Sequence, residues 1–133
     1  NKHKAKIEYL CEKLRLYEFI DKLTGELSSG QKNRVSLAKS IINDPEVLLL
    51  DEPTASLDPE TGDFVRSFLE NYQKEKSASI LLASHNMSEV ERLCENIMMM
   101  KQGKIIDEGT CEELIFKHGR VNLEETFLKL VRE

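Results

Sequence analysis

The stretch ELSSGQKNRVSLAKSIINDPEVLLLDEPTASLD, residues 26–58, decides the fold prediction because a helical pattern in it is followed directly by a strand pattern. Apolar residues at helical spacing run from Val35 to Ile42, and the helix should stop before Asp44-Pro45, since the residue ahead of a proline avoids helical backbone. The continuous apolar run Val47–Asp51 is typical of a strand that is buried on both faces of a parallel sheet.

The rest of the chain continues this alternation of helices and strands. Before the stretch, apolar spacing predicts helices over Ile7–Leu14 and Phe19–Leu23. After it we expect a helix capped by Asp58 with Pro59 at its first position, a strand at Ser79–Ser84, a helix through Val90–Cys94, and a hairpin of Ile97–Lys101 with Lys104–Gly109. A capping box of Thr110 and Glu113 should begin a helix that ends near Gly119, and a last helix should lie within Val121–Glu133. This order predicts an α/β fold.

The composition limits the classes of function. The 133 residues form one domain or a piece of one, and their net charge of −5 predicts no bulk attraction to nucleic acid. No apolar run approaches the roughly 20 residues that cross a bilayer, so contact with a membrane would be through a partner protein. The three cysteines have no metal-ligand spacing and are interpreted as packing thiols in a reducing compartment. Because the first residue is Asn1 rather than Met, we expect the chain to start inside a longer protein.

The segment LSSGQ, residues 27–31, should open the helix that contains Val35. The first turn of a helix leaves backbone N–H groups without partners, and the macrodipole adds about half a positive charge there. Such an end attracts phosphate oxygens, to which Ser28 and Ser29 can donate, while Gly30 allows the backbone to approach a ligand closely. The alternative for these five residues is a plain serine N-cap with a glycine nearby.

Polar residues also follow the two predicted buried strands. Asp51-Glu52 would lie at the carboxyl edge of the sheet, where open α/β proteins bind ligands. In nucleotide hydrolases an aspartate at this place helps to hold Mg²⁺, and a neighbouring carboxylate can polarise the attacking water. His85 follows the other strand, where an imidazole can donate to a terminal phosphate. A polar turn and a loop histidine are the corresponding structural alternatives.

Together, in this order and spacing, these features resemble the C-terminal part of the nucleotide-binding domain of ATP-binding cassette (ABC) ATPases. LSSGQ resembles the family's signature, VLLLDE its Walker B strand, SLD (residues 56–58) its D-loop, and His85 its switch histidine. The resemblance implies a partial P-loop NTPase (RecA-like) parallel sheet with part of the ABC helical subdomain. It assigns residues 1–43 to the end of that subdomain, 44–110 to the ATPase core, and 111–133 to C-terminal helices.

The resemblance also implies roles for single residues. Asp51 would serve Mg²⁺ through water, Glu52 would be the general base, and His85 would touch the γ-phosphate of ATP. The residues expected to contact ATP bound to the opposite subunit of a head-to-tail dimer are Ser28, Ser29, Gly30 and Gln31, and those expected at the dimer interface are Ser56 and Asp58. The sequence departs from the family at Ser29, where glycine is usual, and at Lys39, where arginine is commoner.

The family's phosphate-binding loop, GxxxxGK followed by Ser or Thr, is absent from these residues. The nearest segment, Gly25–Lys32, fails because Gln31 separates Gly30 from Lys32 and because Asn33 takes the place of the hydroxyl residue. Catalysis of phosphoryl transfer depends on positioning and electrostatic stabilisation of the phosphates. We therefore expect these 133 residues alone to bind ATP weakly and not to hydrolyse it.

The resemblance predicts the ATP-binding subunit of an ABC transporter, closest to bacterial multidrug or ABC-2-type exporters. Its implied partners are a second ABC ATPase subunit, identical or different, and a transmembrane permease that holds it on the cytoplasmic face of the membrane; no nucleic acid is expected. Two alternatives stay open. One is an ABC ATPase that serves translation or DNA repair, and the other is a signature-only module that completes a partner's ATP site.

Overall fold

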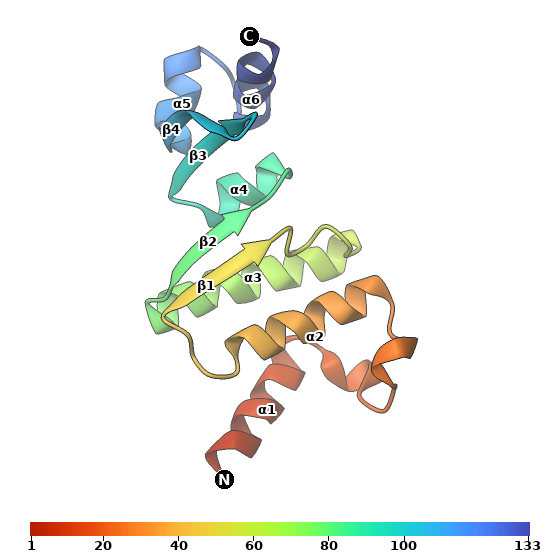
Figure 1. Cartoon of the computed structure of the whole chain (residues 1–133). Helices are drawn as coiled ribbons and strands as arrows, with labels where there is room; N and C mark the ends of the chain where they lie inside the picture. Colours follow the sequence, from red (N-terminus) through yellow and green to blue (C-terminus); the bar gives the residue numbers. More distant parts are fainter. The chain divides into compact units, whose positions relative to one another are not determined.

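The computed structural model describes residues 1–133 and divides them into two compact units, Asn1–Ala83 and Ser84–Glu133 (Figure 1). The first unit contains α1 (Lys2–Lys13), the 3-10 helices η1 (Leu16–Phe19) and η2 (Thr24–Glu26), α2 (Ser29–Ile41), β1 (Val47–Asp51), α3 (Pro59–Lys76) and β2 (Ser79–Ala83). The second contains α4 (Met87–Leu93), β3 (Asn96–Lys101), β4 (Lys104–Thr110), α5 (Cys111–His118) and α6 (Leu123–Arg132).

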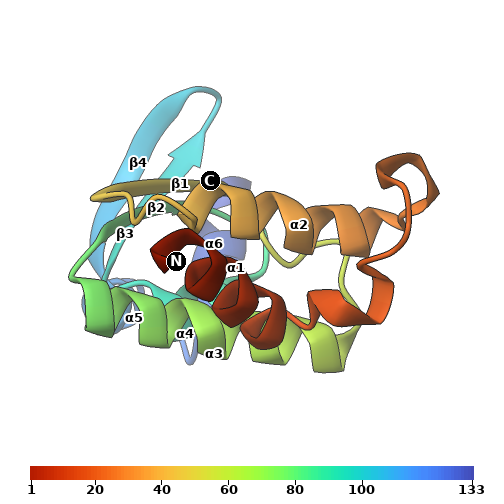
Figure 2. The same cartoon turned by 90° about the horizontal axis from the view of Figure 1, so that it is seen from below.

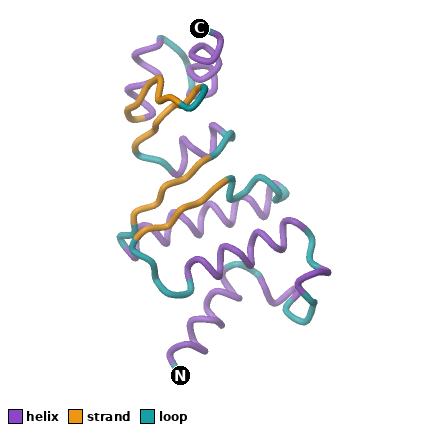
Figure 3. Tube along the Cα trace, viewed as in Figure 1, coloured by secondary structure: helices purple, strands orange, loops and turns teal.

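Helices and strands alternate along the trace as the sequence predicts, which confirms the α/β class (Figure 3). Both predicted helix starts with polar caps are confirmed: Asp58 caps α3 with Pro59 at its first turn, and Thr110 forms a capping box with Glu113 at the start of α5. The α5 helix ends at His118, and the left-handed backbone of the next residue, Gly119, suits a helix C-terminus, as predicted. None of the helices has the length and apolar character needed to cross a membrane.

Three helices supply most of the core of the first unit. Leu14, the residue after α1, is at most 1% exposed, as are Ile41 of α2 and Val65 of α3. In the view of Figure 2, α1 lies in front of the space between α2 and α3. Two ion pairs connect this region to its neighbours: Lys6 of α1 pairs with Asp44 after α2, and Arg15, which follows α1, pairs with Glu60 of α3.

The strands β1 and β2 pair in parallel, with Val47 opposite Ser79 and Asp51 opposite Ala83. Side chains alternate between the two faces of a strand, so β1 buries Leu48 at 3% exposure and leaves Leu49 70% exposed. The predicted burial of this strand on both faces is therefore wrong for the described residues. A continuous apolar run identifies the strand correctly, but it does not show how many of its faces are covered.

The second unit combines an antiparallel hairpin with three helices. Gln102 and Gly103 both adopt left-handed backbone, as a two-residue hairpin turn requires, so β3 and β4 pair as predicted, with an irregularity between Met99 and Met100. The core of the unit consists of Val90, Ile97, Met99, Leu114, Leu123 and Leu130. Each helix presents one apolar face to this core, in agreement with the helical spacing of its sequence.

The predicted helix over Phe19–Leu23 is wrong. Arg15 adopts left-handed backbone (φ 53°) after α1, and a single 3-10 turn follows from Leu16 to Phe19. In a 3-10 helix residues three apart lie on the same side, which allows Leu16 and Phe19 to be buried together while Leu23 is 72% exposed. The segments 1–43, 44–110 and 111–133 stay a prediction, because the two compact units reflect packing and do not test family subdomains.

Candidate functional site

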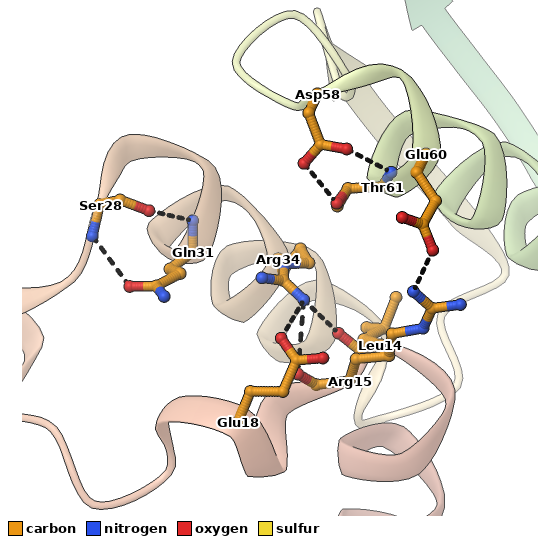
Figure 4. A network of polar contacts seen from close by, with 9 residues as sticks. All are labelled: Leu14, Arg15, Glu18, Ser28, Gln31, Arg34, Asp58, Glu60 and Thr61. Atoms are coloured by element: carbon orange, nitrogen blue, oxygen red, sulfur yellow. Dashed lines mark hydrogen bonds and ion pairs between the residues drawn. The ribbon is translucent and has the colours of Figure 1, made fainter.

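The first turn of α2 is closed by a capping box between Ser28 and Gln31 (Figure 4). The backbone N–H of Gln31 donates to Ser28 Oγ at 3.2 Å, and the backbone N–H of Ser28 donates to Gln31 Oε1 at 3.1 Å. The sequence S-S-G-Q has a serine and a glutamine three residues apart, which is the spacing that such a box requires. The serine N-cap that was the structural alternative is therefore present.

The capping box does not exclude phosphate binding, because each of the two side chains accepts one hydrogen bond in the box and keeps its donor hydrogens. The hydroxyl hydrogen of Ser28 and the amide hydrogens of Gln31 Nε2 stay available, and helix geometry leaves the backbone amides of Ser29 and Gly30 without intrahelical acceptors. All of these groups are donors, and Ser28 and Ser29 are exposed. Such a helix start, with its positive dipole end, fits an anion such as a phosphate group.

The same turn of α2 packs against the loop that follows β1. A Cβ atom at Gly30 would lie 3.0 Å from the backbone oxygen of Ser56 and 3.2 Å from Leu57 Cδ2, so only glycine fits without displacement. Asn33 Nδ2 also donates to Ser56 Oγ at 3.4 Å. The structure thus brings the predicted signature residues next to the predicted D-loop.

Asp58 caps α3 at the end of this loop. It accepts from the Thr61 backbone N–H at 3.0 Å and from Thr61 Oγ1 at 2.7 Å (Figure 4). These hydrogen bonds from Thr61 lower the pKa of Asp58 from its ordinary 3.8. Its role as a helix cap is established by this geometry, whereas its predicted role at a dimer interface stays a prediction.

Asp51 is the last residue of β1, and Glu52 begins the turn after it. Glu52 has left-handed backbone with φ 48°, and its N–H donates to the Ala83 backbone oxygen at 2.8 Å, so the pairing with β2 continues one residue beyond the strand. Left-handed backbone is uncommon for a residue other than glycine, and such strain often accompanies functional positions. Buried Thr54 accepts from Arg66 Nη2 at 3.0 Å, which fastens the loop to α3.

His85 belongs to the second unit and lies in the turn before α4. Its side chain is exposed, and the next residue, Asn86, caps α4 by accepting from the Glu89 backbone N–H at 3.1 Å. The residues at which the sequence predicts chemistry are thus distributed over the two units: the signature, Asp51, Glu52 and the D-loop in the first, and His85 in the second.

Arg34 is a buried structural residue behind the start of α2 that the sequence reasoning missed. It is 8% exposed, and its Nη1 donates to the backbone oxygens of Leu14 and Arg15 at 3.3 and 3.4 Å, where α1 ends (Figure 4). Its guanidinium also lies 4.9 Å from the centroid of the Phe19 ring. Arg34, Leu37, Ala38 and Ile41 are the buried residues of α2, so the helical spacing that identified the apolar face also includes this arginine.

The fold and this arrangement of helix start, strand end and loop are similar to part of the ATP-binding domain of ABC ATPases. The family model described as ABC transporter matches residues 1–55. A structure titled "Structure of ATP binding subunit of ABC transporter" has the same fold, with a TM-score of 0.81 at 24% identity over 96% of this chain and 54% of that one. A dimeric ATP-binding cassette in a post-hydrolysis state, bound to ADP and Pi, matches with a TM-score of 0.67 and 28% identity over 74% of this chain and 44% of that one.

Curated relatives agree with this class. The ABC transporter ATP-binding protein NatA of Bacillus subtilis is 34% identical over 99% of this chain and 54% of its own length. Methionine import ATP-binding proteins MetN 1 of Staphylococcus epidermidis and Bacillus cereus are 32% and 40% identical over 96% and 84% of this chain, and 37% and 33% of their own lengths. The chain is homologous to the ATP-binding subunits of ABC transporters, and it spans between a third and about half of the length of these relatives.

Proposed function

We propose that these residues are part of an ATPase subunit that couples ATP binding and hydrolysis to transport by an ABC transporter. The observation that carries this proposal is the contact between the start of α2, which has several hydrogen-bond donors available, and the loop that follows Asp51 and Glu52. The start of α2 offers donors to phosphate oxygens, and the loop follows the two carboxylates at the end of β1.

In this proposal the residues have separate roles at ATP sites formed by two subunits. Ser28, Ser29, Gly30 and Gln31 bind the phosphates of ATP held by the partner subunit, and Ser56 and Asp58 face that subunit. The dimeric neighbour bound to ADP and Pi supports a paired arrangement. Asp51, exposed at the end of β1, suits Mg²⁺, which is typically bound by one or two carboxylates together with waters and substrate phosphates.

The catalytic roles fall on Glu52 and His85. Glu52 acts as the general base that polarises the attacking water, and His85 donates to the terminal phosphate. A transmembrane permease is the second partner, and it places the subunit on the cytoplasmic face of the membrane. The relatives named above are transport proteins by their printed names, which favours transport over a role in translation or DNA repair.

The test is made on the natural protein at its full length with Glu52→Gln. We expect kcat for ATP hydrolysis to fall by about 100-fold or more while ATP binding is retained, because the substitution removes a base and keeps the shape. Glu46→Gln is the matched control, since Glu46 is an exposed carboxylate one residue before β1, at the opposite end of the strand. Undiminished hydrolysis by Glu52→Gln would overturn the proposed catalytic role.

A further inference from the structure

Three hydrogen bonds form a closed ring around the backbone of His85. Ser84 Oγ donates to Glu89 Oε2 at 2.6 Å, the Glu89 backbone N–H donates to Asn86 Oδ1 at 3.1 Å, and the Asn86 backbone N–H donates to Ser84 Oγ at 3.0 Å. All three residues belong to the second unit, and His85 is the one residue between Ser84 and Asn86. The conformation of this turn therefore depends on side chains on both sides of the histidine.

Glu89 is the buried member of this ring. It is 1% exposed, although a buried carboxylate is unfavourable unless it is hydrogen-bonded. The 2.6 Å bond from the Ser84 hydroxyl has the length of a charge-assisted O–H···O⁻ hydrogen bond, the stronger kind. Burying a glutamate at this position costs more free energy than burying an apolar side chain would. A role in shaping the turn explains why a glutamate is there.

The ring also fixes the direction of the Ser84 hydroxyl. A serine hydroxyl has one hydrogen to donate, and here that hydrogen points to Glu89. The oxygen lone pairs are then oriented toward the Asn86 amide, which closes the turn from the other side. Without the carboxylate the hydroxyl can rotate, and the acceptor for the Asn86 amide is no longer held in place.

We propose that Glu89 is a positioning residue that holds the His85 turn so that the exposed imidazole reaches the terminal phosphate of ATP. This inference rests on the proposed function, since it requires that His85 acts in hydrolysis. Glu89 does not touch the substrate in this role. It acts through Ser84 and Asn86, which set the backbone of the histidine between them.

The experiment compares variants of the full-length natural protein. We expect Glu89→Ala to lower kcat for ATP hydrolysis by 10-fold to 100-fold with KM changed less than threefold, because a misplacement of about 1 Å in a catalytic group has effects of that size. Glu89→Gln keeps an acceptor oxygen for Ser84 and should recover at least a third of the activity. Ser84→Ala breaks the ring and leaves the buried Glu89 side chain in place. It should therefore lower kcat as Glu89→Ala does, and it provides the test if Glu89→Ala folds poorly.

A double-mutant cycle separates positioning from loss of stability. His85→Ala should lower kcat by itself, and Glu89→Ala added to it should lower kcat by less than a further twofold, since the ring then has no imidazole to place. The matched control is Glu91→Ala on the same helix, because Glu91 Oε1 accepts from the Leu123 N–H at 2.7 Å, outside the ring. It should change stability and leave hydrolysis as it was.

The outcomes distinguish this inference from the proposal on which it rests. If His85→Ala hydrolyses ATP at the normal rate, the proposed role of His85 fails and the inference fails with it. If His85→Ala is impaired while folded Glu89→Ala and Ser84→Ala are fully active, only the positioning role is overturned. Full additivity of the two substitutions in the cycle would also contradict it.

Discussion

Gly30→Ala tests whether the entrance of α2 is packed against the predicted D-loop as tightly as the structure indicates. The new methyl group would lie 3.0 Å from the Ser56 backbone oxygen and 3.2 Å from Leu57 Cδ2, so the loop or the helix must move. Overpacking of this kind costs about 1–3 kcal/mol. Alanine is favoured over glycine by up to about 1 kcal/mol in a helix interior, and by less in the first turn. The two effects together predict a net loss of about 1 kcal/mol.

The assay follows tyrosine fluorescence during urea unfolding of the 133-residue chain. All three tyrosines, Tyr9, Tyr17 and Tyr72, belong to the first unit and the chain has no tryptophan, so the signal reports on that unit alone. With an m-value of about 1.5 kcal/mol/M, the loss corresponds to a midpoint about 0.7 M lower in urea.

Gly25→Ala is the matched control for this substitution. A Cβ at Gly25 would have no atom within 4 Å, and its backbone is not left-handed, so alanine should leave the midpoint unchanged or raise it slightly by restricting the unfolded chain. A Gly30→Ala chain that is as stable as the Gly25→Ala chain would refute the argument. The close approach of α2 to Ser56 would then not be a feature of the folded protein.

Two further predictions concern buried charges. Hydrogen bonds from Lys117 and His118 hold the pKa of Asp107 at about 2 instead of 3.8, so its contribution to stability is present above pH 4 and is lost as the pH falls toward 2. After allowance for screening by solvent, this contribution to the free energy of unfolding is roughly 1 kcal/mol. Urea unfolding followed by circular dichroism measures it, and Asp107→Asn should make the stability less dependent on pH in this range. Arg34→Lys should destabilise the first unit by about 2 kcal/mol in the tyrosine fluorescence assay. The reason is that lysine lacks the planar group that reaches two carbonyls and stacks on Phe19. An unchanged midpoint would contradict this prediction.

The sequence predicts most secondary structure of this chain because the deciding signals are local. Asp58 before Pro59 and Thr110 before Glu113 are capping patterns that act within one turn, and both helices begin where these patterns place them. The hairpin turn at Gln102-Gly103 is local in the same sense. The helix predicted over Phe19–Leu23 fails because the left-handed residue at the end of α1 gives no comparable signal.

Features that depend on contacts distant in sequence could not be predicted. The exposed face of β1 depends on what covers the strand, and the apolar run itself is the same with one covered face or with two. Gly30 suggested close approach of the backbone to a ligand, whereas the structure shows that its missing side chain first makes room for Ser56. Spacing alone does not reveal such a neighbour, since 26 residues separate the two positions in the chain.

The candidate site shows why a structural alternative and a functional interpretation need not exclude each other. Ser28 and Gln31 satisfy each other as a helix cap, in which each side chain accepts one hydrogen bond and keeps its own donor hydrogens. Ser84 likewise has a local structural role, because its hydrogen bond to Glu89 fixes the turn that contains His85. In both places the hydrogen bonds that stabilise the local fold also determine which hydrogen-bonding groups stay available for other contacts.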